Sequence, residues 1–385
     1  MDRRSFTTLG AATALALFVA DSAWAAGETV KIGFNAPLTG FAAADGNSAK
    51  IGAELAVDQA NAAGGIDGRE IELVVYDDQA KPDQAVPIAN KLIGRDGVKI
   101  GISGSYSGAT RAAATVYQNA GIPYISAYAV HPDITRAGDY VFRTSFVGEV
   151  QGRAGAKLIG ETLGKKRVSL ITLQNDFGKS LAAGFKEAAG DFGIEVVSEY
   201  QYSIKDRQFG PVVAKVKSDD PEAIYASGYF FTAGPLVKQL RGAGVGVPVI
   251  GQEGYDSEKF IEIAGDAAEG IIITTSLDRD SDSPEARGFI AAFEKRAGFK
   301  TDMVAASAHT AVKVAVAALR AAGTEDPKAI RDAVARTKLA ASTGEISFNA
   351  LGEVRKAVQV QIVRGGEWHR HSVIDDPALL APPSE

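Results

Sequence analysis

Short β-rich runs and helical runs alternate along almost the whole chain, and this order permits few folds. From Val30 onward the first β-rich runs are VKIGFNAPL at 30, EIELVVYDD at 70, VKIGIS at 98, IPYISAY at 122 and YVFRTSF at 140. Helical patterns begin at Ala49, Asp83 and Thr110, and glycines such as Gly121 lie at or just past their ends, where a left-handed residue is favoured. This alternation predicts a largely parallel sheet with helices on both faces.

A second series of the same kind follows the first. Its β-rich runs are RVSLITLQND at 167, IEVVSEYQY at 194, EAIYASGY at 222, VPVIGQE at 247 and GIIITTSLD at 270. After Leu277 the chain is strongly helical, and it ends in a hairpin pattern, GEISFNALGEVRKAVQVQIV. We therefore predict an α/β protein with two doubly wound lobes, by duplication or by convergence of local patterns. The late helices need a surface to cover, so we expect several crossovers between the lobes, and therefore a hinge.

The N-terminal residues have the order of a secretory signal peptide. Arg3 and Arg4 begin a short positive segment, residues 9–20 are apolar, and residues 23–25, Ala-Trp-Ala, form a small-x-small cleavage site. The apolar run is too short to span a bilayer, which needs about 20 residues. The string RRSFTTLG also resembles a twin-arginine export signal, so the sequence leaves the export route open.

Composition narrows the location and the class of partner. The chain has no cysteine, so it lacks the residue that a bacterial lipoprotein carries at its cleavage point, and we expect a freely diffusing protein of the periplasm. The formal net charge is −6, and the expected signal peptide carries equal numbers of acidic and basic residues, so the mature chain keeps that charge. A mildly acidic protein has no electrostatic reason to bind nucleic acid or to associate with an anionic membrane, and we expect no membrane insertion.

Sequence motifs for catalysis or for a cofactor are missing. The chain has four histidines, and no HExxH, GxSxG or Walker A sequence occurs. The glycines of GISGSYSG at 101–108 do not fit GxGxxG, and GAGVGVP at 242–248 precedes a strand, which is the wrong context for a nucleotide. We therefore expect no cofactor, no metal and no enzymatic activity. A secreted α/β hydrolase or cofactor enzyme and a ligand sensor are the competing hypotheses.

Hydroxyl groups gather where the first lobe is expected to bind a ligand, beyond the carboxyl end of its third strand. Ser103, Ser105, Ser107 and Thr110 crowd the start of the following helix. Exposed amides and the helix dipole at such a position favour a carboxylate or another anion. A simple helix cap, which serine and threonine supply routinely, is the alternative interpretation.

The corresponding edge of the second lobe offers Phe177, Tyr229 and Glu253. Glu253 directly follows VPVIGQ, and a carboxylate at the end of a buried strand is costly to desolvate unless a cation or several donors meet it. Glu253 is therefore a candidate partner for a ligand ammonium group. A helix-capping or surface role is the alternative.

These residues occur within strings that resemble the branched-chain amino-acid-binding (Leu/Ile/Val-type) members of the type I periplasmic binding proteins, over essentially the whole mature chain. The strings include KIGFNAPLTG, GAELAVDQANAAGGIDGREIELVVYDD, GIPYISAYAVHPDIT followed by YVFRTSF, DFGKSLA and AEGIIITT. The resemblance implies two lobes joined by a three-segment hinge that close on one ligand for the permease of an ABC importer. We assign residues 1–25 to the signal peptide, 28–145 and 276–340 to the N-terminal lobe, and 146–275 and 341–377 to the C-terminal lobe.

The resemblance also implies roles for the candidate site residues. In such proteins a serine and the amides of the loop after the fourth strand hold the ligand α-carboxylate, and here these roles fall on Ser107 and on residues 128–130. A Glu and a Tyr of the second lobe meet the ammonium group, which here are Glu253 and Tyr229. These assignments predict a ligand-binding site shared between the two lobes.

Two departures from the family pattern leave the ligand open. Val130 stands where Thr is frequent, which keeps the amide and removes a hydroxyl, and Asp45 stands near the first loop, where an aromatic is common. Asp45 either meets a donor-bearing or cationic ligand end or caps the next helix. Phe177 would close over the ligand, and together with Tyr106 and Tyr128 it could line a pocket for a ring. We expect a small amino acid, branched-chain or otherwise aliphatic, with an aromatic carboxylate, an amide or urea as alternatives.

Overall fold

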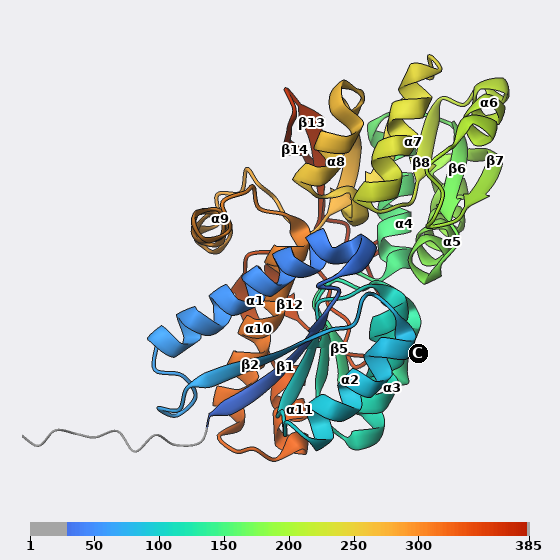
Figure 1. The fold of residues 1–385 in the computed structure, drawn as a ribbon. Helices are drawn as coiled ribbons and strands as arrows, with labels where there is room; N and C mark the ends of the chain where they lie inside the picture. Colours follow the sequence, from blue (N-terminus) through green and yellow to red (C-terminus); the bar gives the residue numbers. More distant parts are fainter. Residues whose placement is uncertain (1–28, 383–385) are drawn as a thin grey trace, which may run out of the picture.

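The first of two large sheets belongs to the lower lobe in Figure 1. The computed structural model describes residues 29–382, so the expected signal peptide lies outside the described residues. The sheet is parallel throughout, with the order β2-β1-β3-β4-β5. Its strands are β1 (Val30–Ala36), β2 (Ile71–Asp77), β3 (Ile100–Ser103), β4 (Tyr124–Ser126) and β5 (Val141–Arg143). This order is doubly wound, and its ligand crevice lies beyond the carboxyl ends of the strands.

The second sheet repeats this order in the upper lobe. Its parallel strands run β7-β6-β8-β9-β10, and β13 and β14 extend it as an antiparallel hairpin. The strands are β6 (Arg167–Leu173), β7 (Glu195–Tyr202), β8 (Ala223–Ala226), β9 (Val249–Gln252), β10 (Ile272–Thr275), β13 (Val358–Arg364) and β14 (Glu367–Ile374). The prediction of two doubly wound lobes of one architecture is therefore confirmed.

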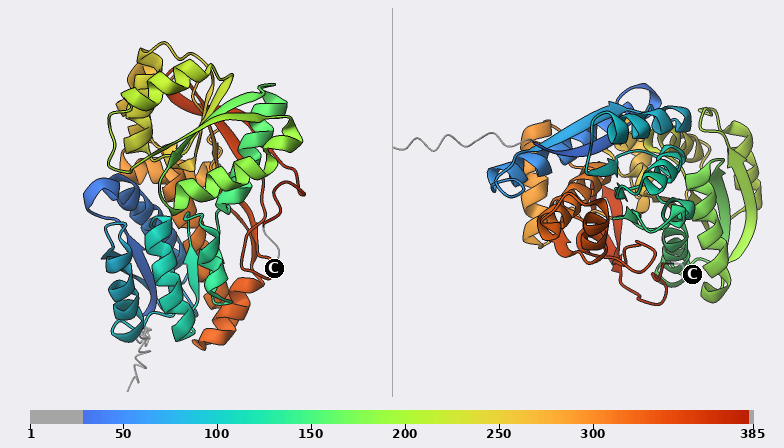
Figure 2. Two further views of the ribbon diagram at one scale, coloured as in Figure 1. Left: turned by 90° about the vertical axis from the view of Figure 1, so that its right-hand side faces the viewer. Right: turned by 90° about the horizontal axis from the view of Figure 1, so that it is seen from below.

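Helices cover both faces of each sheet, as the two views of Figure 2 show. In the first lobe α1 packs with α10, and α2 packs with α3, in two separate apolar layers. In the second lobe α4 packs with α5, and α7 with α8. The helices are α1 (Ala43–Ala62), α2 (Pro82–Gly94), α3 (Ser107–Ala120), α4 (Gly148–Lys157), α5 (Asp176–Ala189), α6 (Gly210–Asp219), α7 (Phe230–Gly242), α8 (Glu258–Ala264), α9 (Pro284–Ala297), α10 (Met303–Ala322) and α11 (Pro327–Ala335). The short helical turns are η1 (Gly40–Ala42), η2 (Pro132–Ala137), η3 (Leu158–Thr162), η4 (Gly190–Phe192), η5 (Glu253–Tyr255) and η6 (Gly265–Ala268).

The chain passes between the two lobes three times, at 144–147, 276–283 and 348–357. Before the third passage, β11 (Lys338–Ala341) and β12 (Gly344–Ser347) form a small hairpin beside α10. The division of the chain between the lobes stays a proposal. The sequence-based division placed the boundary at residue 341, inside this hairpin. Phe348 packs on Phe142 of β5 with ring centroids 5.4 Å apart, so we favour assigning the whole hairpin to the first lobe.

The close packing of α1 against α10 brings the start of α10 to the boundary between the lobes. A Cβ atom added at Gly52 of α1 would lie 2.3 Å from the carbonyl oxygen of Ala305, so only glycine permits this approach. Among the described residues, α10 is also the one helix long and apolar enough to cross a membrane, but 83% of its apolar window is buried inside the protein. Its composition is therefore explained by its place in the core of the first lobe.

His309 gives this core a predicted pH dependence. The side chain lies inside α10, only 4% exposed, with Nε2 2.9 Å from Gln59 Oε1, and burial lowers its pKa from 6.5 to about 3. The unfolded chain therefore takes up this proton first, so the stability contributed by neutral His309 is complete above pH 6.5 and is lost as pH falls toward 3. We expect wild type to lose about 2 kcal/mol relative to His309→Gln between pH 8 and pH 5. Urea unfolding of both proteins measures this difference; parallel pH profiles would contradict the assignment.

Candidate functional site

A pocket lies between the lobes, beyond the carboxyl ends of strands from both sheets. Six of the seven predicted residues line it: Asp45, Ser107, Tyr128, Phe177, Tyr229 and Glu253. Val130 is not part of the pocket wall, but its amide donates a hydrogen bond of 3.3 Å to Ser107 Oγ. Residues distant in the sequence are thus brought to one place, and their part in binding stays a proposal.

The hydroxyl-rich start of α3 is mostly structural. Ser103 Oγ and Thr110 Oγ1 lie 2.6 Å apart in a hydrogen bond, and Ser105 Oγ donates to Asp78 at 2.9 Å. Of the four hydroxyl residues only Ser107, the first residue of α3, lines the pocket. The residue before it makes no side-chain cap. An anion at this helix start would therefore meet one hydroxyl, backbone amides and the positive end of the helix dipole.

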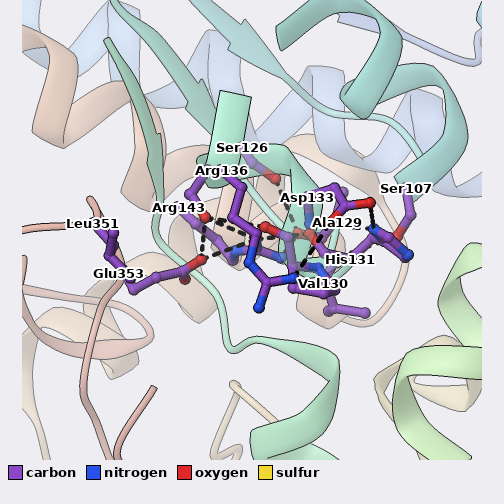
Figure 3. A network of polar contacts seen from close by, with 12 residues as sticks. Ser107, Ser126, Ala129, Val130, His131, Asp133, Arg136, Arg143, Leu351 and Glu353 are labelled. Carbon is purple, nitrogen blue, oxygen red and sulfur yellow. Dashed lines mark hydrogen bonds and ion pairs between the residues drawn. The ribbon is translucent and has the colours of Figure 1, made fainter. Parts of the chain in front are cut away.

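A fully buried arginine holds the loop that follows β4 (Figure 3). Arg143 donates to the carbonyl oxygens of Ala129 at 2.9 Å and of His131 at 2.8 Å. It also donates to Glu353 at 3.0 Å, and Glu353 accepts a further hydrogen bond from Thr135. Since Glu353 belongs to the segment that leads back to the second lobe, this network ties the pocket loop to the hinge.

Aromatic rings of the two lobes meet face to face. Tyr106 of the first lobe stacks on Tyr229 of the second, with ring centroids 4.1 Å apart and an interplanar angle of 2°. Phe177 stacks on Tyr229 at 4.9 Å, and Phe41 packs edge-on against Phe231 at 5.4 Å. Phe177 and Tyr229 both belong to the second lobe. The Tyr106–Tyr229 and Phe41–Phe231 contacts join the two lobes, so they exist only when the lobes are close together.

Glu253, at the end of β9, is a buried acid with an unusual environment. Neither carboxylate oxygen completes a hydrogen bond to a described residue, and burial raises the pKa of Glu253 to about 8. The Gln151 amide and the Lys356 ammonium lie near enough to oppose this rise. Lys356 is itself buried, with Nζ 5.1 Å from the centre of the Phe146 ring, and burial lowers its pKa to about 7. Glu253 thus keeps both oxygens available to a donor entering the pocket.

Asp45 lies in the first turn of α1, yet it does not cap that helix. Its Oδ2 accepts a 2.7 Å hydrogen bond from the Tyr106 hydroxyl, and no described backbone amide donates to it. Burial raises the pKa of Asp45 to about 8; the Tyr106 hydroxyl opposes this rise, and the nearby Asp302 and Asp256 carboxylates add to it. The capping alternative is therefore not what the structure shows.

Residues 29–366 match the family described as "Periplasmic binding protein". The chain belongs to this family. The "Leucine-, isoleucine-, valine-, threonine-, and alanine-binding protein" of Pseudomonas aeruginosa is 31% identical over 94% of this chain and 95% of its own length.

Solved structures of transporter binding proteins resemble this periplasmic binding protein over most of its length. LivJ of Streptococcus pneumoniae, a branched-chain amino acid transporter substrate-binding protein in complex with isoleucine, is 31% identical and superposes with a TM-score of 0.84 over 90% of this chain and 99% of its own. A solute-binding protein of Rhodopseudomonas palustris in complex with benzoate is 27% identical, with a TM-score of 0.82 over 91% and 99%. The resemblance stated from the sequence is confirmed.

Sequence reasoning missed several residues of this periplasmic binding protein. Met303 and Val304 line the pocket because α10 begins beside it, and no local pattern marks that position. Lys356 gave no signal either, because the run GEISFNALGEVRKAVQVQIV was expected to form a hairpin. That expectation was wrong: β12 pairs with β11 and β13 with β14, so Lys356 lies in the passage between the lobes. Arg143 did leave one, because a charged residue inside the β-rich run YVFRTSF needs buried partners. Its partner Glu353 lies 210 positions away and is visible only in the fold.

Proposed function

We propose that this protein captures a small amino acid between its lobes in the periplasm and delivers it to the membrane permease of an ABC importer. One observation carries the proposal: Ser107 at a helix start and the unpaired carboxylate of Glu253 line one pocket from different lobes. A helix start favours an anion and a buried carboxylate favours a cation, so the pair is complementary to a zwitterion. The Pseudomonas relative is named for leucine, isoleucine, valine, threonine and alanine, and the Streptococcus protein was solved with isoleucine. Both support a small amino acid whose side chain is aliphatic or, as in threonine, carries a hydroxyl.

Closure of the lobes is the proposed mechanism. The ligand binds the first lobe through its carboxylate, and the second lobe then supplies Glu253 and Tyr229. Contacts made only in the closed form are the differential interaction that shifts the population. Shifting the equilibrium from a mostly open to a mostly closed population needs roughly 5 kcal/mol of differential binding free energy. Charge-assisted hydrogen bonds contribute about 1.5–3 kcal/mol each, so two strong ones or three of average strength supply this free energy.

An aromatic carboxylate is the second candidate ligand. Tyr106, Tyr128 and Phe177 all line the pocket, and rings of this kind offer flat apolar surfaces for a ligand ring. The benzoate complex of the Rhodopseudomonas protein shows that one similar protein binds such a ligand. Amides and urea remain further alternatives of the same class.

We further propose that the protein catalyses no reaction and diffuses freely after export. The relatives are named as binding proteins, which supports the first statement. The order of residues 1–25 and the absence of cysteine support a cleaved signal peptide without a lipid anchor. The export route, through an ordinary or a twin-arginine signal, is testable by exchanging Arg3 and Arg4 for lysine and measuring the exported fraction.

Calorimetric titration of the mature protein tests the proposed function. With leucine, isoleucine, valine, threonine, alanine and benzoate as ligands, we expect binding of at least one amino acid. Ser107→Ala should weaken that binding by about 1–3 kcal/mol, since it removes one charge-assisted hydrogen bond. Ser105→Ala is the matched control, because its hydroxyl is bonded to Asp78 and lies outside the pocket. Equal affinities for wild type and Ser107→Ala would remove Ser107 from the site, and binding of benzoate alone would favour the second candidate.

A further inference from the structure

Asp45 has one carboxylate oxygen that the protein itself does not use. The side chain is only 5% exposed and lines the pocket. Oδ2 accepts from the Tyr106 hydroxyl, while Oδ1 accepts from none of the described residues. A buried carboxylate with an unused acceptor is costly unless a donor reaches it. The donor would have to come from the contents of the pocket.

The position of Asp45 separates it from the expected carboxylate subsite. Its partner is the far end of the Tyr106 side chain, whereas the backbone of Tyr106 immediately precedes Ser107. Asp45 thus stands one tyrosyl side chain away from the helix start where an anion is favoured. Met303 and Val304, also on the pocket wall, have apolar side chains.

The charges around the pocket are one-sided. Two carboxyl groups, Asp45 and Glu253, line it, and none of the lysines, arginines or histidines among residues 29–382 does. If the ligand ammonium occupies Glu253, Asp45 still lacks a partner for Oδ1. An aliphatic ligand side chain next to Asp45 would exclude water from its Oδ1 atom without supplying a hydrogen-bond donor.

We propose that Asp45 binds a hydrogen-bond donor, an O–H or N–H, on the part of the ligand remote from its α-carboxylate. This inference rests on the proposed function and narrows it: the preferred ligand is an amino acid with a hydroxyl, amide or ammonium group on its side chain rather than a purely aliphatic one. Sites built to hydrogen-bond a ligand group discriminate strongly against analogues that lack it, because the buried protein group is left unpaired. Recognition then has three points: Ser107, Glu253 and Asp45.

The Tyr106 hydroxyl connects this contact to lobe closure. Asp45 fixes one edge of the Tyr106 ring, and the face of that ring stacks on Tyr229 of the second lobe. A ligand donor that binds Asp45 would therefore influence the carboxyl group that orients Tyr106 for its stacking on Tyr229. Donor-bearing ligands should gain affinity both from the direct hydrogen bond and from the closed form.

Pairs of ligands that match in shape and differ in the donor test the proposal. Calorimetry of the mature protein would compare threonine with valine, asparagine with leucine, and lysine with norleucine. We expect the donor-bearing member of at least one pair to bind roughly tenfold or more tightly. In Asp45→Ala that ratio should fall to near one. Asp45→Asn, which is nearly isosteric, should keep a preference for a hydroxyl and lose a preference for an ammonium group, so it separates the two sources of donor.

Asp83→Ala is the matched control. Asp83 lies in the first turn of α2 as Asp45 does in α1, but it is exposed and outside the pocket, so its removal changes only a helix-terminal charge. The ligand ratios should stay at their wild-type values in this variant. Thermal unfolding would confirm that all variants are folded.

Two results would overturn the inference, and they are distinguishable. Equal or tighter binding of the aliphatic member in every pair, or ratios that survive in a folded Asp45→Ala, would refute the role of Asp45 while leaving the proposed function intact. Failure of wild type to bind any amino acid of the panel would refute both proposals.

Discussion

Replacing Glu253 with glutamine should weaken binding of an amino acid by about 2–5 kcal/mol, or roughly thirtyfold or more. The substitution keeps the shape of the side chain and removes its charge, so the ligand ammonium group is buried without an ionised partner. An aromatic carboxylate has no cation for Glu253, and for such a ligand the substitution should be neutral or favourable. Titration of wild type and Glu253→Gln therefore also tells the two ligand classes apart.

The same pair of proteins should differ in pH dependence. Because burial raises the pKa of Glu253 to about 8, this carboxyl group must lose a proton when it receives an ammonium group below that pH. Affinity of wild type for an amino acid should therefore rise between pH 6 and pH 8. Loss of the Lys356 proton near pH 7 acts in the same direction, since it removes a like charge.

Glu258→Gln is the matched control for Glu253, because Glu258 is an exposed acid a few residues away in α8. Its affinity and pH profile should equal those of wild type. If a confirmed amino acid binds Glu253→Gln as tightly as wild type, Glu253 does not receive the ammonium group.

Removal of Arg143 should lower the free energy of unfolding by about 3–5 kcal/mol. Arg143→Met leaves the Glu353 carboxylate buried with only the Thr135 hydroxyl as a partner, and it removes one hydrogen bond from each of the carbonyl oxygens of Ala129 and His131. The double variant Arg143→Met/Glu353→Leu should recover part of this loss, because no unpaired charge remains in the core. Urea denaturation with the slope compared among variants gives the measurement.

An exposed ion pair provides the comparison for Arg143. Lys259 and Glu262 are about half exposed and lie one turn apart in α8, so Lys259→Met should change stability little. If Arg143→Met were no more destabilising than Lys259→Met, the buried network would not hold the loop. A folded Arg143→Met should also bind its ligand more weakly, because the loop carrying the amide of Val130 is no longer fixed.

The sequence was sufficient for the architecture because its signals are local. Each strand and helix has its signal in a short run of residues. The runs VKIGFNAPL and VPVIGQE, for example, predict strands without knowledge of what packs beside them. The positions of Ser107 and Glu253 at the ends of such runs placed both at the carboxyl edge of a sheet, and the structure brings both to one pocket.

What the sequence could not supply are the pairings between distant segments. Ser103, Ser105 and Thr110 looked like parts of a binding surface, yet their hydroxyls serve the first lobe internally. Two contacts depend on how the third passage of the chain lies against the pocket. They are the approach of Lys356 to Glu253 and the ion pair of Glu353 with Arg143. No periodicity encodes such contacts, because they follow from the packing of whole lobes.

The order of segments along the chain also governs how the molecule can be made. The helix α10, which packs beside α1 in the first lobe, follows all five parallel strands of the second, and β13 and β14 of the second lobe come later still. A growing chain therefore cannot finish either core until most of its length has been synthesised. Such late, long-range pairing slows folding and prolongs the exposure of apolar surface. We therefore expect both cores of this chain to be completed late in synthesis.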